Sequence, residues 1–395
     1  MLQKCYKLST CVLSFCGKQL FVYALPLLFL SVASIRAQNA RATTTNEKPV
    51  AKKSSTENNN EKKSSDDSKT TSNAPAKKND LSRWIEFDTI SFSDRYHFIE
   101  NTNRSKSANN DQYQIQIKGR FKFDPKGKYA VTAGLYTGKS FTSGWNNTGW
   151  GTGRRQTNLY VKQLYFQARP VKGLEFQLGG IPILFGQSTE ATAYDNDNYI
   201  TGERVSLKYP KKLFFDEISV TNAFLGDLNQ PSVFRRFKRL GRSNYRQFLV
   251  ARHIGKRANF SVDCTFQSGT DTLRQAIRIK VPESKLFDSV VYENYQIVGD
   301  RPGYGFNAFG EKKLNTAFSL SGGFAHIDRK LLNGDRFAQG NRIHFTLGAK
   351  LGHDFSLSVP FTQMLGSSPD VRVRTRVDVV LTYKLLGFLQ RKKVL

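Results

Sequence analysis

The sequence predicts an all-β protein, a transmembrane antiparallel up-and-down β-barrel of about 16 strands, with 14 to 18 compatible. Side chains alternate between apolar and charged along residues 371–385 and along several earlier stretches. Short and long connections alternate from residue 81 onward. The 395-residue chain is rich in Phe (30), Tyr (16) and Gly (30), which suits strands, aromatic anchoring and tight turns. It has no apolar run of ~18 residues after the N-terminal region, which excludes a bundle of spanning helices.

The stretch 371–385 shows the alternation most clearly. Its odd positions are mainly apolar, whereas its even positions include Arg372, Arg374, Arg376 and Asp378. Successive side chains of a strand point to opposite faces, so one face is apolar and the other carries most of the charge. The stretch exceeds the ~9–11 residues that a tilted strand needs to cross a bilayer. The same two faces recur at 113–123, 277–281, 343–351 and 355–362.

Sixteen strands are expected between turns and loops. Short connections such as 124–127 and 352–354 hold the Gly, Pro or Asp of tight turns, and they alternate with longer ones such as 138–157. Turns at one rim and loops at the other are typical of outer-membrane barrels. Because lipid does not tolerate open sheet edges, the last strand should pair with the first. The expected strands are 88–100, 112–123, 129–137, 158–170, 174–185, 201–209, 214–224, 245–253, 259–267, 273–281, 289–297, 304–309, 316–327, 341–351, 355–364 and 371–385.

The first 80 residues are expected to precede the barrel. Three lysines lie ahead of the apolar run 20–33, which suits a secretory signal peptide, so we interpret residues 1–37 as that peptide. Residues 38–80 offer little to bury and are interpreted as a disordered polar periplasmic linker. The barrel then spans 81–395. Of the cysteines only Cys264 lies in it, which excludes an internal disulfide framework and favours a buried apolar role.

The charged faces of the strands carry mostly cations. An Arg on the lipid face near the midplane costs ~2–4 kcal/mol, so these faces should line an aqueous lumen. Arg and Lys in a pore favour anions, and the predicted function is passive diffusion of small hydrophilic solutes with a preference for anions. The other interpretation is that carboxylates on neighbouring strands neutralise each cation. The lumen residues are Lys118, Arg120, Lys122, Arg274, Arg278, Lys280, Arg342, Lys350, Arg372, Arg374 and Arg376.

The connection 225–244 gathers further cations and fits three roles. It could fold inward as a basic constriction, contact the phosphates of lipopolysaccharide, or remain solvated. Its cations are Arg235, Arg236, Lys238, Arg239 and Arg242.

Catalysis finds little support in the sequence. No histidine lies in a GxSxG or HExxH context, and no metal or cofactor is expected. Two alternatives to a channel remain: a loop-plugged structural or adhesive barrel, and a membrane-embedded hydrolase.

The net charge of +28 does not indicate a nucleic-acid partner. The cations are spread over strands and turns and do not form one dense basic helix. The expected partners are outer-membrane lipid and lipopolysaccharide, small anionic or polar solutes, and other copies of the chain in a homotrimer.

The pattern resembles bacterial outer-membrane porins, particularly the alginate-export-like barrels. The stretches that carry the resemblance are 113–123 followed by 129–136, and 174–186 followed by 202–209. The resemblance implies a location in the outer membrane of a Gram-negative bacterium. Porins of this pattern often have Gly-Arg where this chain has Gly179 and Gly180, so an alginate or phosphate substrate is not implied. They also often end in an aromatic residue, a role that Phe388 could fill.

Overall fold

The computed structural model describes residues 83–140, 143–150, 158–189, 198–209, 214–227, 229–267, 271–298, 302–328, 339–366, 373–392 and 394. The described residues all belong to one compact unit, Pro75–Leu395. The predicted signal peptide (1–37) and the predicted linker (38–80) lie outside these residues and stay predictions.

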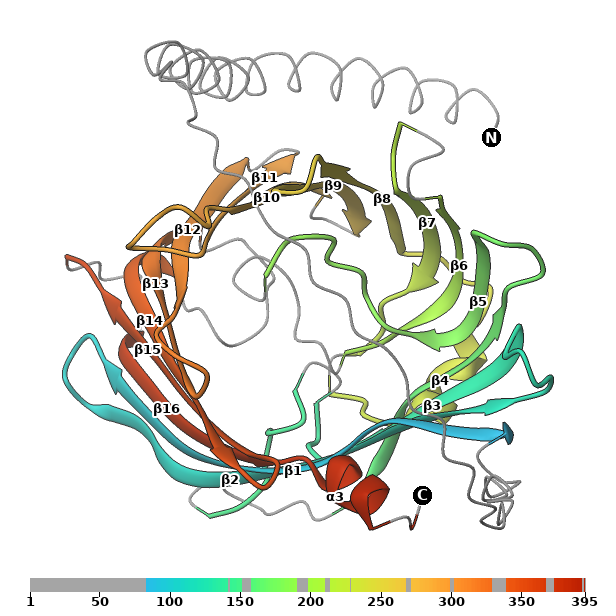
Figure 1. Cartoon of the computed structure of the whole chain (residues 1–395), viewed down its shortest axis with the longest axis horizontal. Coiled ribbons are helices and arrows are strands. Elements are labelled where there is room, and N and C mark those ends of the chain that lie inside the picture. Colours follow the sequence, from blue (N-terminus) through green and yellow to red (C-terminus); the bar gives the residue numbers. More distant parts are fainter. Residues whose placement is uncertain are drawn as a thin grey trace, which may run out of the picture. The chain divides into compact units, whose positions relative to one another are not determined.

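Sixteen antiparallel strands form a closed barrel, each pairing with its neighbours in sequence. Figure 1 shows them as a continuous ring. The strands are β1 (Ile85–Asn101), β2 (Lys106–Lys122), β3 (Tyr129–Tyr136), β4 (Tyr160–Ala168), β5 (Leu174–Ile181), β6 (Ile200–Lys208), β7 (Glu217–Phe224), β8 (Tyr245–Ile254), β9 (Ala258–Gln267), β10 (Asp271–Lys280), β11 (Ser289–Val298), β12 (Gly303–Lys313), β13 (Phe318–Ile327), β14 (Gly340–Gly352), β15 (Phe355–Met364) and β16 (Val373–Tyr383).

Among the described residues, three short helical elements accompany the strands: α2 (Val233–Arg236), η2 (Phe237–Arg239) and α3 (Leu385–Arg391). In the described ranges, no helix is long and apolar enough to cross a membrane.

Closure of the barrel by the last strand is confirmed. β1 pairs with β16 from Phe92 opposite Tyr383 to Asn101 opposite Val373. The strand ends earlier than expected, because the chain turns into α3 after Lys384. Phe388 therefore lies in α3 and not at the end of the last strand. The aromatic residue that ends β16 is Tyr383, whose ring stacks on Phe355 with centroids 4.6 Å apart.

The two faces of the sheet are also confirmed. Residues directly opposite in an antiparallel ladder share a face, so the register assigns each side chain to the outside or the lumen. The outward row includes exposed apolar residues such as Phe92 (46% exposed), Phe121 (47%) and Phe345 (46%). A belt of exposed Phe, Leu and Val around a closed barrel is suited to hydrocarbon and not to water. Cys264 is buried, as predicted.

β8 is an exception to the apolar outer face. Its outward row holds Arg246 and Arg252 beside Phe248 and Val250, as the sequence alternation indicates. Arg252 lies close to the turn between β8 and β9, and its guanidinium sits 3.8 Å from the ring centroid of Phe214. A cation at the end of a strand can reach the polar interface while its stem remains against an aromatic ring.

Candidate functional site in the barrel lumen

The register places the predicted lumen cations of the described strands on the inward face. Lys118, Arg120 and Lys122 of β2 lie opposite Gly134, Thr132 and Ala130 of β3, facing away from the outward Phe121. On β16, Arg376 lies opposite Thr362 of β15, and Arg374 belongs to the same row. Arg372 lies outside the described residues.

Some of these cations have carboxylate partners across the ladder. Arg120 and Lys122 share Glu86, with N–O distances of 2.6 and 2.9 Å. Arg274 lies 3.7 Å from Asp263, and Arg278 forms an ion pair with Glu311. Arg376 donates to Asp378 of its own strand at 2.8 Å. Charge neutralisation by neighbouring strands therefore applies to part of the lumen face.

Four other lumen cations have no such partner among the described residues. Across the ranges that the structure describes, no carboxylate lies within ion-pair distance of Lys118, Lys280, Lys350 or Arg374. Lys280 and Lys350 are exposed. Arg342 is fully buried, and its guanidinium donates to the carbonyl oxygens of Gln339 (3.0 Å) and Val373. Lys118, Lys280, Lys350 and Arg374 therefore leave an excess of positive charge on the inner wall.

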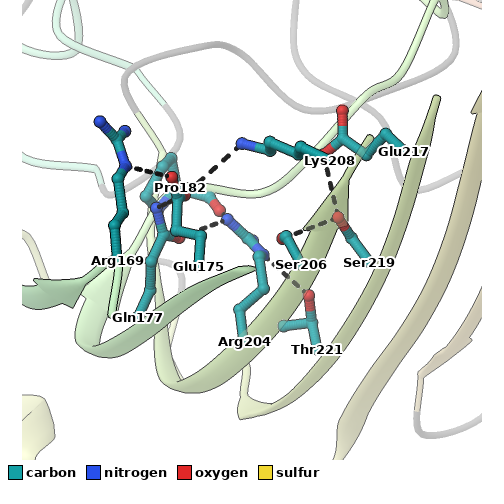
Figure 2. A network of polar contacts seen from close by, with 10 residues as sticks. All are labelled: Arg169, Glu175, Gln177, Pro182, Arg204, Ser206, Lys208, Glu217, Ser219 and Thr221. Atoms are coloured by element: carbon teal, nitrogen blue, oxygen red, sulfur yellow. Dashed lines mark hydrogen bonds and ion pairs between the residues drawn. The ribbon is translucent and has the colours of Figure 1, made fainter. Parts of the chain in front are cut away.

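One wall of the lumen is held by a polar network over β5, β6 and β7 (Figure 2). Arg204 is 2% exposed and donates to Thr221 Oγ1 at 2.9 Å, to Gln177 Oε1 at 3.0 Å and to the carbonyl oxygen of Pro182. Glu175 accepts a hydrogen bond from Arg169 at 2.8 Å and lies 3.5 Å from Lys208 Nζ. Neutral acceptors thus fix the Arg204 cation in one orientation, with its positive charge retained.

The segment 182–189, which follows β5, crosses the inside of the barrel. Gln247 of β8 donates to the carbonyl oxygen of Leu184 at 2.8 Å. The backbone N–H of Gln187 donates to Ser261 Oγ of β9 at 2.7 Å. The N–H of Thr189 donates to Glu293 Oε2 of β11, also at 2.7 Å. These partners lie on inward faces several strands away from β5, and Figure 1 shows the green trace within the ring. This segment narrows the lumen.

This inward segment is not predicted from the sequence. The stretch 174–185 reads as one strand, because the apolar residues continue through Ile183, Leu184 and Phe185. In the structure β5 ends at Ile181, and Ile183 packs in a buried cluster with Tyr199 and Tyr245. An apolar run that continues after Pro182 was the available signal, because a solvated loop has no reason to be apolar.

The connection 225–244 lies elsewhere. Its helix α2 packs against β4, and Val233 lies so close to Gly180 that a Cβ added there would come within 2.2 Å of Val233 Cγ2. Gly180 shares the face of Leu164 and Leu178, which is the outward one. The guanidinium of Arg236 is buried, 4.9 Å from the ring centroid of Tyr199. Burial lowers the pKa of Arg236. The remaining cations, Arg235, Lys238, Arg239 and Arg242, are exposed.

A second ionic cluster joins β1 and β16 at the closure of the barrel. Asp378 accepts from Arg376 at 2.8 and 3.0 Å and contacts His97, and Arg95 lies 4.0 Å away. The guanidinium of Arg95 also lies 4.5 Å from the ring centroid of Trp145, which comes from the connection after β3. Below this cluster a recess of about 550 Å³ opens along β1, β2 and β16.

Groups suited to catalysis or metal binding are not assembled in the described residues. His97 contacts Asp378, and His253 contacts Asp216. Among the described residues, no serine hydroxyl forms a hydrogen bond with either imidazole. Within the same part of the chain, no three His, Cys, Asp or Glu side chains could hold a metal ion together.

Comparisons with known proteins show the fold. No protein-family model matches the chain, and no curated protein is similar to it. Salmonella typhi OmpF, solved in complex with daunomycin, covers 76% of this chain and 97% of its own, with 8% identity and a TM-score of 0.51. Pseudomonas putida OprB covers 77% of this chain and 94% of its own, with 8% identity and a TM-score of 0.49. A mutant porin of Rhodopseudomonas blastica covers 76% and 100%, with 10% identity and a TM-score of 0.47. The chain therefore has the 16-stranded barrel fold of a bacterial porin.

Proposed function

We propose that the chain forms a passive diffusion channel for small hydrophilic solutes in the outer membrane of a Gram-negative bacterium, and that the channel prefers anions. The observation that carries the proposal is the set of lumen cations without carboxylate partners in the described strands: Lys118, Lys280, Lys350 and Arg374. A low-dielectric wall around an aqueous lumen focuses such a field and raises the local concentration of anions. The fold shared with OmpF supports a pore.

The surroundings of the channel follow from its outer surface. The apolar belt meets outer-membrane lipid, and the exposed cations Arg235, Lys238, Arg239 and Arg242 suit contact with lipopolysaccharide phosphates. A homotrimer, the predicted signal peptide (1–37) and the predicted linker (38–80) belong to the same proposal.

A planar-bilayer recording tests the channel and its preference together. The purified barrel is inserted under a KCl gradient, and the reversal potential is measured. We expect a sign that corresponds to chloride permeating faster than potassium. A reversal potential that favours potassium would refute anion preference. The matched variants are Lys350→Gln, which should reduce the preference, and Arg252→Gln, an outward cation whose loss should leave it unchanged.

A plugged barrel with a structural or adhesive role is the second candidate, since segment 182–189 occupies the lumen. It predicts no conductance from a barrel that is folded by its heat-modified gel mobility. Any stepwise conductance that scales with salt would exclude a complete plug.

A further inference from the structure

We propose that the recess along β1, β2 and β16 binds a neutral saccharide. The recess has a volume of about 550 Å³ and lies on the inner face. Trp145 lines it together with the Asp378 cluster, and Leu386, Gly387 and Gln390 of α3 line it as well. The inference rests on the proposed function only in that solutes must reach the lumen; the recess itself differs in chemistry from the rest of the wall.

The charges that line the recess balance each other. Its carboxylates are Asp88, Asp354 and Asp378, and its cations are Arg95, Arg376 and Lys384. Asp378 is already bonded to Arg376, and Asp354 accepts from Arg391 at 3.0 Å. A site for an anion would need an excess of cations, and a site for a cation an excess of carboxylates. A recess with neither excess is suited to an uncharged ligand, in contrast to the cationic wall elsewhere.

The side chains between these charges are hydroxyls and amides. They come from adjacent strands and point inward as a short polar row: Ser91, Ser93, Gln114, Gln116, Ser358 and Thr382. Hydroxyls and amides both donate and accept hydrogen bonds, as the hydroxyls of a polyol do. The Ser93 and Thr382 hydroxyls, 2.9 Å apart across the β1–β16 seam, show that the two strands present such groups side by side.

Trp145 supplies an apolar surface at one end of the row. Its backbone N–H donates to Ser143 Oγ at 3.2 Å, and its carbonyl accepts from Thr148 at 2.8 Å, so the loop fixes the backbone that carries the indole. Arg95 stacks on the ring at 4.5 Å. A pyranose has apolar C–H groups and a rim of hydroxyls. An aromatic plate beside a row of donors and acceptors matches both parts of it.

The test uses the protein's own fluorescence. The chain has three tryptophans, so Trp84→Phe combined with Trp150→Phe leaves Trp145 as the only indole. The full-length barrel in detergent micelles is titrated with maltotriose, and in parallel with glucuronate, a sugar acid. The heat of maltotriose binding to the unsubstituted protein is measured by calorimetry. We expect a saturable signal with maltotriose and a weaker one with glucuronate.

Matched variants localise the binding. We expect Trp145→Ala and Ser358→Ala each to weaken maltotriose binding by about tenfold, the scale of one lost stacking or hydrogen-bonding partner. Ser321→Ala removes an inward hydroxyl of β13 that does not line the recess, and it should leave the affinity unchanged. Each variant's folding is checked by heat-modified gel mobility.

Two results would overturn the inference. One is the absence of any saturable heat or fluorescence change with maltotriose; the other is glucuronate binding as tightly as maltotriose. Neither result depends on ion selectivity. If chloride preference is found and maltotriose does not bind, only the saccharide inference fails. If maltotriose binds but the barrel does not conduct, the channel fails and the recess remains a saccharide site.

Discussion

Arginine substitutions at two adjacent positions of β14 separate the lipid face from the lumen face. Leu347 is 40% exposed and lies opposite Leu320 and Val359, so it belongs to the apolar outer row. Its neighbour Thr346 lies opposite Ser321 and Pro360 and points into the lumen. Both positions lie near the middle of the 13-residue strand. The two substitutions, Leu347→Arg and Thr346→Arg, therefore add the same charge at the same depth on opposite faces.

The expected difference is large. An Arg facing lipid near the midplane destabilises a barrel by ~2–4 kcal/mol, which corresponds to a change of roughly 30- to 700-fold in the folding equilibrium. An Arg in the aqueous lumen should change the free energy of unfolding by no more than about 0.5 kcal/mol, as for a typical surface substitution. Loss of the contacts between Leu347 and its neighbours on the outer face adds to this destabilisation.

Urea titration of the barrel in phospholipid vesicles measures this difference. Tryptophan fluorescence and heat-modified gel mobility report the folded fraction. We expect the midpoint for Leu347→Arg to fall well below that of the unsubstituted protein, and the midpoint for Thr346→Arg to remain close to it. Equal midpoints for the two variants, or a lower one for Thr346→Arg, would refute the assignment of faces.

Three further outcomes are expected. Arg374→Ala should spare assembly and reduce chloride preference, measured as the reversal potential. Glu293→Ala should weaken the attachment of Thr189 to the wall and increase open-channel current noise, because a hydrogen bond to a charged acceptor contributes ~1.5–3 kcal/mol; unchanged noise would mean that other contacts hold the segment. The hydrogen bond from Arg391 lowers the pKa of Asp354. Their ion pair therefore holds α3 in place at any pH above the ordinary Asp pKa of ~3.9, and it is lost as the pH falls through the lowered pKa. A spin label attached at Lys392→Cys should therefore become mobile only in strong acid. In the same protein carrying Asp354→Asn, the label should be mobile at every pH.

The strands and their faces could be predicted from the sequence because both depend on local rules. A period of two fixes which residues share a face, and lipid requires every backbone group to be paired. The alternation in 371–385 was therefore enough to place Arg374 and Arg376 inside and Val377 and Val379 outside. Closure onto the first strand then followed, and β1 and β16 pair as expected.

The ion pairs could not be predicted, because they depend on the stagger between strands. Asp378 contacts His97, although 281 positions separate them in sequence. A shift of two residues in the β1–β16 register would keep every side chain on its face and replace every partner. The neutralised and the uncompensated cations look alike in sequence: Arg278 and Lys280 share one strand face, and only Arg278 reaches a carboxylate in the described part.

The same limit applies to the inward segment and to α3. A strand prediction continues as long as apolar residues do, so 174–185 reads as one strand and the last strand reads through to 385. Their paths are decided by distant partners: Ser261 and Glu293 for the first, and Asp354 for the second. Sequence alternation contains no information about contacts across a lumen.

The uncompensated cations and the balanced recess respond differently to salt, which makes the two proposed properties separable in one protein. The proposed selectivity depends on the field of Lys118, Lys280, Lys350 and Arg374 acting over the width of the lumen. The Debye length falls from ~10 Å at 0.1 M salt to ~3 Å at 1 M, so chloride preference should largely vanish in concentrated salt. Maltotriose binding depends on short-range hydrogen bonds and on Trp145, and should persist there. If saccharide affinity and ion selectivity decline together as salt rises, the recess is an electrostatic site after all, and its balance of charges is not what determines the ligand.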